Sequence, residues 1–469
     1  MEYRIEKDSL GEIKVPADKY WGANTQRSLQ NFKIGPKASM PVEVIKAYGF
    51  IKKAAAITNC KLGILSSDKK DLIVKVCDEI ITGELNEHFP LVIWQTGSGT
   101  HTNMNCNEVI SNRAKTICSP HNLNEKIFIH PNDDVNKSQS TNDTFSSAMH
   151  ISAYMKLSDY LLPRLKLLVN TLNKKANSFW DIIKVGRTHC MDATPIRLGQ
   201  VFSGYASQIE FAEKSIKKAL PNLAELSLGG TAVGTGLNTC EGYDKIVTSI
   251  IAELTGYPFT TGDNKFSMLS NHDAILNAHS ALKQLAVCLI KISNDIRMLA
   301  SGPRAGLNEL QMPAHEAGSS IMPGKSNPTQ IEALTMVCTQ VLGNDLTITT
   351  ANSQGQFELN TFKPVIIANF IQSTTLLGDA IQSFTDNCLS AIKPNTETIN
   401  KYMENSLMLV TALTPHIGYE KAGEIANKAL KENISLKEAA IRMGYVTSEQ
   451  FHNWVNPIDM TAPNVKSPK

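Results

Sequence analysis

Long apolar stripes at helical spacing constrain the fold of this 469-residue chain more than any other feature. Apolar residues that recur at spacings of three and four lie on one face of a helix. Helices with such a face bury it against other helices, so the pattern predicts a helical bundle with the stripes in its core. One stripe consists of Phe202, Tyr205, Ile209, Ala212 and Ile216, and a second of Leu282, Leu285, Leu289, Ile292, Ile296 and Leu299.

The character of the sequence changes twice along the chain. Residues 1–140 mix short helical runs with polar loops, residues 141–395 carry the long stripes, and residues 396–469 contain shorter amphipathic pieces. Strand-like alternation is sparse. We therefore expect a mainly all-α protein with an N-terminal mixed or helical domain, a central helical bundle and a small C-terminal helical domain. Pro163 and Pro364 are expected to kink or begin helices.

Composition excludes several classes of partner. Apolar residues make up 42% and charged residues 19%, and the net charge is +2, so no strong field favours nucleic acid or an anionic membrane. We find no run of about eighteen uncharged apolar residues that would span a bilayer. The nine cysteines are scattered without a CxxC pair, which is typical of a reducing compartment. The opening residues MEYRIEKDSLGEIKVP lack the apolar segment of a secretory signal, and we expect a cytoplasmic protein.

Four polar loops interrupt the apolar helices. Hydroxyl, amide and ammonium groups all donate hydrogen bonds, so the loops suit a ligand with several negative charges. For each loop taken by itself, a purely structural role is an open alternative to ligand binding. Ser98 and Thr100 are also typical caps of a helix that begins near Met104, and His189 and Lys325 are compatible with a core histidine and a surface cation. The loops run from Thr96 to Asn107, His130 to Asp143, Gly186 to Pro195 and Gly318 to Pro328.

Other chemistries find less support in the sequence. The loop LGGTAVGTGLNT from Leu228 superficially resembles a dinucleotide-binding loop, but no strand is expected before it and its glycine spacing is not GxGxxG. We interpret it as a tight crossover between helices. The run HPNDD from His130 comes nearest to a metal-ligand pattern without having convincing spacing, and no GxSxG nucleophile elbow occurs.

The string GSSIMPGKSNP, from Gly318 to Pro328, resembles the GSSxxPxKxNP signature of the fumarase/aspartase superfamily. Three places favour class II fumarases over aspartases: His189 in the RTH tripeptide, Gly324 in PGK, and HPND from His130. The chain is identified as a member of the class II fumarases, with aspartate ammonia-lyase or another lyase of the superfamily as the alternative. Further segments resemble class II fumarases in the same order and extend the resemblance over nearly the whole chain: KYWGANTQRSLQNFKIG, WQTGSGTHTNMNCNEVISNRA, HPNDDVNKSQSTND, GRTHCMDATP, LGGTAVGTGLNT, NKFSMLSNHD, ASGPRAGLNEL and MVCTQVLGND.

The resemblance implies a three-domain, all-helical fold with a long central bundle that assembles into a homotetramer. It implies the reversible hydration of fumarate to L-malate, a step of the tricarboxylic acid cycle, with active sites drawn from three subunits. Neither a cofactor nor a metal is expected.

The resemblance also assigns roles to residues. Ser319 maps to the base, which must act as an alkoxide stabilised by loop N–H groups and by Lys325. His189 and Glu332 map to a catalytic pair that handles the water. The substrate contacts that the resemblance implies are Ser98, Gly99, Thr100, Ser140, Thr141, Asn142, Thr188, Ser320, Lys325 and Asn327.

Some positions depart from the family pattern. Thr141 stands where serine is typical, and Ser326 where valine is usual. An arginine that accompanies the family's second anion site falls on Ile127, next to Lys126, so we expect that site to bind dicarboxylate less well. The second anion site maps to His130, Pro131, Asn132 and Asp133.

Overall fold

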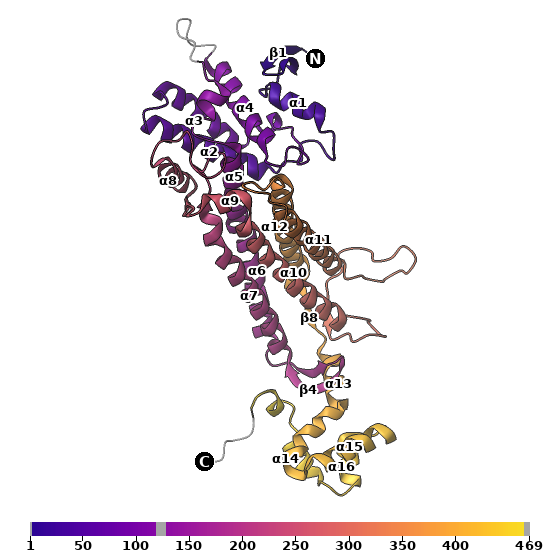
Figure 1. Cartoon of the computed structure of the whole chain (residues 1–469). Helices are drawn as coiled ribbons and strands as arrows, with labels where there is room; N and C mark the ends of the chain where they lie inside the picture. Colours follow the sequence, from indigo (N-terminus) through magenta and orange to yellow (C-terminus); the bar gives the residue numbers. More distant parts are fainter. Residues whose placement is uncertain (1, 119–127, 464–469) are drawn as a thin grey trace. The chain divides into compact units, whose positions relative to one another are not determined.

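The computed structural model describes residues 2–118 and 128–463, and both Ile127 and Lys126 lie outside the described residues. The described chain is mainly helical and contains four two-stranded sheets, as the sequence predicts for an all-α protein with few strands (Figure 1). The helices are α1 (Ala23–Asn31), α2 (Val42–Lys61), α3 (Ser67–Thr82), α4 (Thr100–Cys118), α5 (Thr141–Met155), α6 (Leu162–Ser178), α7 (Leu198–Ala224), α8 (Tyr243–Thr255), α9 (Lys265–Ser270), α10 (Asp273–Leu299), α11 (Thr329–Asn352), α12 (Lys363–Asn387), α13 (Thr396–Asn405), α14 (Thr414–Ile417), α15 (Tyr419–Glu432), α16 (Leu436–Arg442) and α17 (Ser448–Trp454). The strands are β1 (Tyr3–Asp8), β2 (Gly11–Pro16), β3 (Ile183–Thr188), β4 (Met191–Arg197), β5 (Glu225–Leu226), β6 (Thr260–Thr261), β7 (Leu310–Gln311) and β8 (Lys393–Pro394).

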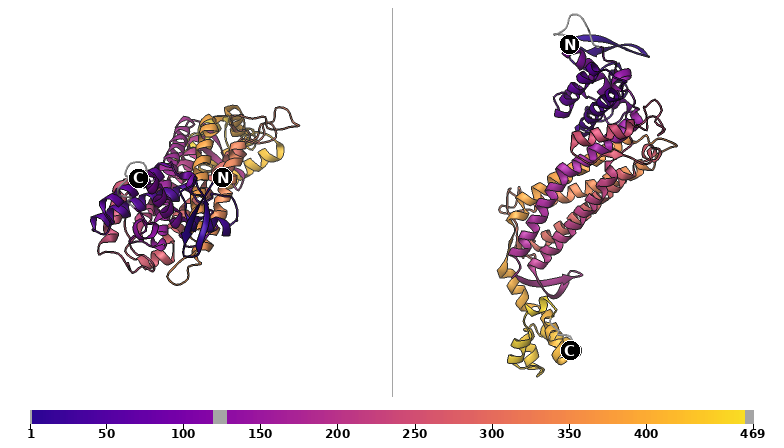
Figure 2. Two further views of the ribbon diagram at one scale, coloured as in Figure 1. Left: turned by 90° about the horizontal axis from the view of Figure 1, so that it is seen from above. Right: turned by 90° about the vertical axis from the view of Figure 1, so that its left-hand side faces the viewer.

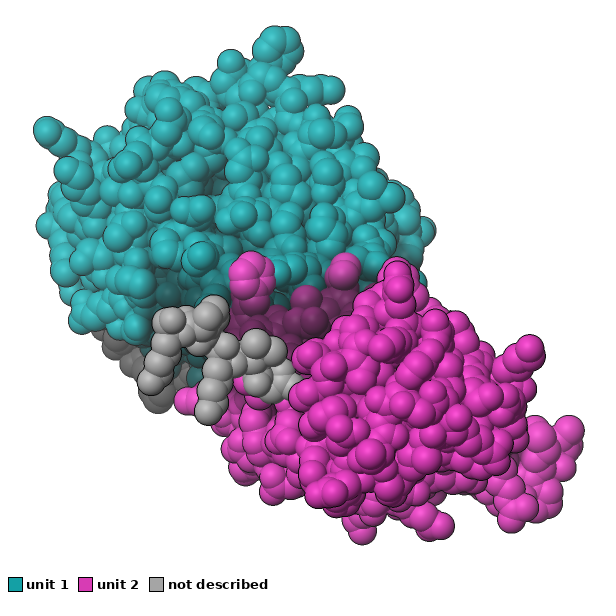
Figure 3. Space-filling model, turned by 90° about the horizontal axis from the view of Figure 1, so that it is seen from below, with its two compact units in different colours: residues 1–163, 212–286, 337–378 teal, residues 164–211, 287–336, 379–469 magenta. Residues whose placement is uncertain are grey.

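The chain divides into two compact units (Figure 3). Four long helices, α7, α10, α11 and α12, contribute residues to both units. Unit 1 comprises residues 1–163, 212–286 and 337–378, and unit 2 comprises residues 164–211, 287–336 and 379–469.

The two apolar stripes lie in the core, as predicted. Every residue of both stripes is at most 9% exposed. Pro364 opens α12, and Pro163 follows a π-helical turn, Lys156–Leu161, so both prolines mark helix starts or irregularities as expected. Helix α10 is long and apolar enough to cross a membrane by length and composition alone, but half of its most apolar window is buried inside the protein, as in a core helix.

In unit 1, α2 packs against α3, α5 and α8, while α4 packs against α1 and α3. Within unit 1, helices α10, α11 and α12 lie side by side (Figure 2), and a buried histidine of α10 is hydrogen bonded to the other two. His279 is hydrogen bonded through Nδ1 to Asp345 Oδ1 (3.0 Å) and through Nε2 to Ser373 Oγ (2.9 Å). Buried polar contacts of this kind fix which helix faces meet.

The N-terminal residues form a hairpin that the sequence analysis did not predict. Strands β1 and β2 pair antiparallel from Tyr3 with Pro16 to Asp8 with Gly11. The hairpin packs against α1. Six-residue strands with one partly buried face give only a weak alternation signal.

The glycine-rich loop after Leu228 connects α7 to α8, which confirms the predicted crossover between helices. The expectation that no strand precedes it is wrong, because the two-residue strand β5 comes just before and pairs in parallel with β6. Gly229 has a φ of +91°, and a Cβ there would lie 2.5 Å from Asp244 Cβ, so the turn requires glycine.

In unit 2, the β3–β4 hairpin shares a hydrophobic core with the C-terminal helices. Val185 of β3 is buried in one cluster with Leu413, Ile425 and Ala439. The base of this hairpin is therefore anchored by apolar packing, while its tip, which carries His189, projects from the anchor.

Candidate active site

The first candidate segment, residues 96–100 of unit 1, is a tight turn that leads into α4. Helix α4 begins at Thr100, four residues before the start expected near Met104. The buried Ser98 Oγ lies 2.9 Å from Thr100 Oγ1. Gly99 has a φ of +82°, and a Cβ there would lie 2.0 Å from the Phe145 ring. Only glycine fits this position, and the turn fixes the two hydroxyl groups at the helix start.

The second segment, residues 140–142, starts helix α5 in the same unit. Ser140 is the N-cap, and its Oγ accepts a hydrogen bond from the Asn142 backbone N–H (3.2 Å). The Ser140 N–H donates to the Asp143 carboxylate (2.9 Å), which completes a capping box. The positive end of the helix dipole lies at these residues and favours a negatively charged ligand.

The helices that begin at these two segments, α4 and α5, are hydrogen bonded to each other. Asn103 of α4 donates from Nδ2 to Thr141 Oγ1 (3.0 Å), so the Thr141 hydroxyl accepts here and keeps its own O–H for donation to another group. Asn142 donates from Nδ2 to the Ala232 carbonyl oxygen (2.7 Å), which ties the glycine-rich crossover to the same site. The structure therefore brings together Ser98, Thr100, Thr141 and Asn142 within one unit.

Three buried charged groups that sequence reasoning missed lie behind these segments. Asp143 is fully buried and accepts hydrogen bonds from the N–H groups of Gly229 (3.0 Å) and Thr231 (2.9 Å). Lys363 donates from Nζ to the Asn142 carbonyl oxygen (3.1 Å), and its N–H donates to the Gly97 carbonyl (3.0 Å). Lys363 thus links segments 96–100 and 140–142 directly.

The third buried group is Lys52 of α2. Its Nζ donates to Asn136 Oδ1 (3.0 Å) and to Gln139 Oε1 (3.0 Å). Asn136 Oδ1 also accepts from Asn103 Nδ2 (3.0 Å), the amide that contacts Thr141. The only sequence signal for Lys52 was its place in the apolar, alanine-rich run FIKKAAAI.

The signature loop, residues 318–328 of unit 2, is an exposed ribbon held by its own backbone. The Gly318 N–H donates to the Lys325 carbonyl (3.0 Å), and Asn327 Nδ2 donates to the Gly318 carbonyl. A Cβ on Gly318 would lie 2.3 Å from the Lys325 carbonyl oxygen, so glycine is needed for this closure. The side chains of Ser320 and Lys325 are exposed.

Ser319 lies inside this ribbon, and its hydroxyl oxygen faces backbone donors. Ser319 Oγ accepts hydrogen bonds from the N–H groups of Met322 (3.0 Å) and Ile321 (3.3 Å). Two N–H groups aimed at one oxygen form a small anion-binding nest. This arrangement stabilises negative charge on Ser319 Oγ.

His189 occupies a two-residue turn between β3 and β4. Thr188 pairs with Met191, and both residues between them have positive φ angles, 55° for His189 and 60° for Cys190. Two positive φ angles are typical of a type I′ turn, which normally carries Asn-Gly. His189 is thus held exposed in a conformation that histidine disfavours, and such local strain is commonly found at functional sites.

The strand next to this turn is braced by a buried carboxylate. Glu309 is fully buried and lies 2.7 Å from Arg187 Nη2 and 3.1 Å from Lys184 Nζ. The register shifts between Val185 and Arg187, and a Cβ on Gly186 would lie 2.5 Å from the Thr194 carbonyl oxygen. The bulge directs Arg187 toward Glu309 and stiffens the hairpin below His189.

Glu332 lies exposed in the first turn of α11, four residues after Pro328. Within the described residues of one chain, no hydrogen bond or ion pair joins Glu332 to His189, or either of them to Ser319. The structure therefore gathers one group of predicted residues in unit 1 and places Thr188, His189, Ser319, Ser320, Lys325, Asn327 and Glu332 in unit 2.

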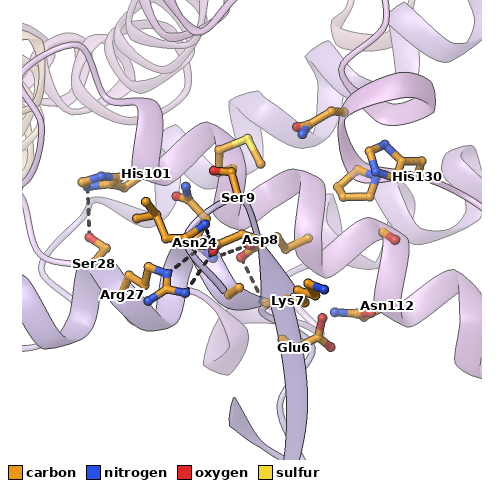
Figure 4. A pocket seen from close by; sticks show the side chains of 18 of the residues that line it. Glu6, Lys7, Asp8, Ser9, Asn24, Arg27, Ser28, His101, Asn112 and His130 are labelled. Atoms are coloured by element: carbon orange, nitrogen blue, oxygen red, sulfur yellow. Dashed lines mark hydrogen bonds and ion pairs between the residues drawn. The ribbon is translucent and has the colours of Figure 1, made fainter. Parts of the chain in front are cut away.

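Three of the four residues predicted for the second anion site line a cavity of about 660 Å³ in unit 1, and Asp133 does not (Figure 4). His130, Pro131 and Asn132 contribute to its wall, and His130 Nδ1 accepts from the Asp133 N–H (3.0 Å). The charge of Arg27 in this cavity is already balanced, because its guanidinium pairs with Asp8 at 2.8 Å. Among the described residues, no three His, Cys, Asp or Glu side chains are grouped as metal ligands.

Comparison with known proteins supplies the family. Residues 11–343 match a lyase family model, and residues 409–462 match the model for the fumarase C C-terminus. A class II fumarate hydratase of Pasteurella multocida is 60% identical over 98% of this chain and 99% of its own, and one of Staphylococcus aureus is 55% identical over 99% and 100%. A crystal structure of class II fumarase from Schistosoma mansoni superposes with a TM-score of 0.95 at 44% identity, covering 98% of this chain and 99% of that one. The chain belongs to the class II fumarate hydratases.

Proposed function

We propose that this enzyme interconverts fumarate and L-malate with Ser319 as the base and His189 as the group that handles the water. In the direction of elimination, a proton leaves the carbon next to one carboxylate of malate, and the dianion becomes an enediolate-like trianion. The main task of the site is to stabilise this added charge with preorganised donors.

One observation carries the role of Ser319. Its Oγ accepts hydrogen bonds from the N–H groups of Ile321 and Met322. These donors favour the alkoxide that a serine base requires. Lys325 and Asn327, in the same ribbon, are proposed to bind the carboxylate that becomes the enediolate. Ser320 is proposed as a further substrate contact.

His189 is proposed to act with Glu332 as its carboxylate partner. A carboxylate fixes the tautomer of an imidazole and raises its basicity, which suits acid–base work near neutral pH. Ser98, Gly99, Thr100, Ser140, Thr141, Asn142 and Thr188 are proposed to bind the remaining substrate oxygens. Their support is the position of the hydroxyl and amide groups at two helix starts, where N–H dipoles favour anions.

The assembly is proposed to be a homotetramer in the cytoplasm. The described residues of one chain do not join His189, Ser319 and Glu332, and this separation fits a site completed by neighbouring subunits. The second anion site on His130, Pro131, Asn132 and Asp133 is proposed to bind dicarboxylate less well than the family pattern implies, since Ile127 stands where the family has an arginine and Arg27, which lines the same cavity, is paired with Asp8.

The reaction is tested directly by absorbance of fumarate after addition of L-malate. Incubating fumarate with and without ammonium and identifying the product separates malate from aspartate. Formation of aspartate in place of malate would refute the proposed chemistry.

The shared site is tested by complementation. A His189→Asn chain and a Ser319→Ala chain, unfolded together and reassembled, should regain a measurable fraction of activity. Sites that receive each group from an intact chain carry neither defect. If mixed tetramers confirmed on a sizing column are no more active than either parent, each site belongs to one chain and the proposal of shared sites is wrong.

A further inference from the structure

The two buried lysines behind the 140–142 segment have no carboxylate partner. Lys52 and Lys363 are both 0% exposed. Among the described residues, neither ammonium group lies within 4.0 Å of a carboxylate oxygen. An unpaired buried cation is costly unless the protein or a ligand supplies negative charge. The two buried ammonium groups therefore favour a nearby ligand that carries negative charge.

The hydrogen bonds of both lysines lead to the proposed substrate contacts. Lys363 Nζ donates directly to the Asn142 carbonyl oxygen (3.1 Å). Lys52 reaches Thr141 through Asn136 and Asn103, a chain in which each contact is 3.0 Å long. Both cations therefore end on adjacent residues at the start of α5.

We propose that Lys52 and Lys363 form a buried cationic layer behind Thr141 and Asn142, and that the dianionic substrate supplies the negative charge which this layer lacks. The lysines are positioning residues rather than catalytic residues, since they act through Thr141 and Asn142. The inference rests on the proposed function, because it assumes that these two residues bind substrate. Asp143 lies nearby, so the three groups together carry one excess positive charge when all are ionised.

Burial shifts the pKa values of the two lysines into a pH range in which their loss of charge can be measured. Burial lowers the pKa of Lys363 to about 7 and that of Lys52 to about 8. Burial also raises the pKa of Asp143 to about 6. The lysines thus lose charge between about pH 7 and pH 9, above the titration of Asp143.

Six further buried ionisable groups on the helices and loops around the lysines titrate outside this pH range. Burial holds the pKa of His272, ahead of α10, well below its usual value, and that of His150 at about 4. Burial raises the pKa of Cys106 to about 12. The pKa values of Cys77 of α3, Tyr48 of α2 and Tyr243 of α8 are also raised well above their usual values by burial.

The test compares two competitive inhibitors of different charge: succinate, an unreactive dianion, and its monoamide, a monoanion. Lys363→Met should weaken succinate binding on the order of tenfold and Lys52→Met a few-fold, with a smaller loss for the monoamide. Wild-type affinity for succinate should fall from pH 7 to pH 9, and this fall should be flatter in Lys363→Met. Lys53→Met is the matched control on the same helix, since Lys53 pairs with the exposed Asp78 and lies outside the layer.

Equal losses for the two inhibitors would mean that the substitution only misplaces Asn142, and would overturn the proposal. Unchanged succinate binding in Lys363→Met would overturn it as well. Asn142→Ala separates this failure from failure of the proposed function. If Asn142→Ala loses affinity while Lys363→Met retains it, only the cationic layer is wrong, whereas retention in both variants refutes the binding segment itself. If Lys363→Met does not assemble, Lys52→Met decides the question: the proposal requires that this variant lose more affinity for succinate than for the monoamide.

Discussion

The segments proposed to bind substrate and the segments proposed to do the chemistry are built in opposite ways. Residues 96–100 and 140–142 lie at helix starts, with glycines pressed against neighbours and charged groups buried behind them. The signature loop and the His189 turn are exposed and are held chiefly by their own backbone hydrogen bonds. Binding donors gain from rigidity and desolvation. The proposed base and its proposed acid partner are not joined by a hydrogen bond or ion pair within the described residues of one chain.

The comparison predicts that substitutions in the exposed segments change turnover without changing stability. Ser319→Ala should lower kcat on the order of a thousand-fold or more, because no other hydroxyl in the loop occupies the same pair of N–H donors. The thermal midpoint should stay within about 1 °C of wild type, since the side chain packs against no core. Kinetics and calorimetry on the same preparation check both parts. Near-normal turnover would remove Ser319 from the role of base.

His189→Asn should lower kcat by roughly a hundred-fold, the range for loss of general acid–base help. One limb of the pH–rate profile should flatten with it. Asparagine accepts positive φ angles, so the turn should keep its shape and the variant should remain folded. An unchanged rate and pH profile would show that His189 has only a structural role.

A substitution in the buried segments should instead lower the stability of the protein. Gly99→Ala places a methyl group 2.0 Å from the Phe145 ring at a φ of +82° and should cost about 3 kcal/mol of stability. Urea unfolding measures this loss, and Gly63→Ala is a control, since Gly63 also has positive φ but has open space around it. Equal losses at both glycines would assign the effect to φ alone and not to packing around the binding turn.

The smallest effect expected is a pH dependence of the unliganded protein. The folded pKa values of Lys52 and Lys363 are lower than their values in the unfolded chain, so the unfolded chain binds more protons between about pH 7 and pH 10. Stability should therefore rise with pH through this range, by a few degrees in Tm, and the rise should shrink in Lys363→Met. A saturating concentration of succinate should also reduce this rise of Tm with pH. A Tm that falls over this range in wild type and variant alike would contradict the burial of these charges.

The sequence predicted the bundle well because its signals are local. The stripes in α7 and α10 need only helical periodicity, and the starts at Pro163 and Pro364 follow from proline geometry. The β3–β4 turn was missed because Thr-His-Cys-Met carries no Asn-Gly signal. Helix α4 begins before Met104 because the Gly99 turn, and not a simple cap, sets its first residue.

The candidate site was predictable only where residue type alone carries the chemistry. Resemblance singled out Ser319 and Lys325, and the structure adds the N–H donors around the Ser319 oxygen. Lys363 gave no local signal and Lys52 only its place in an apolar run, since a lysine is ordinarily a surface residue. Their burial results from contacts between segments up to 221 residues apart.

In the turn that carries His189, the residue proposed for catalysis differs from the residue that would make the turn most stable. Asparagine at position 189 and glycine at position 190 would relieve the positive φ angles of the two residues and pin the hairpin more firmly. Directed evolution for heat resistance alone would therefore favour loss of the histidine and enrich inactive proteins. A thermostability screen on this enzyme needs a simultaneous selection for growth on malate or fumarate, and residues 189 and 190 are best held fixed in any library built from turn statistics.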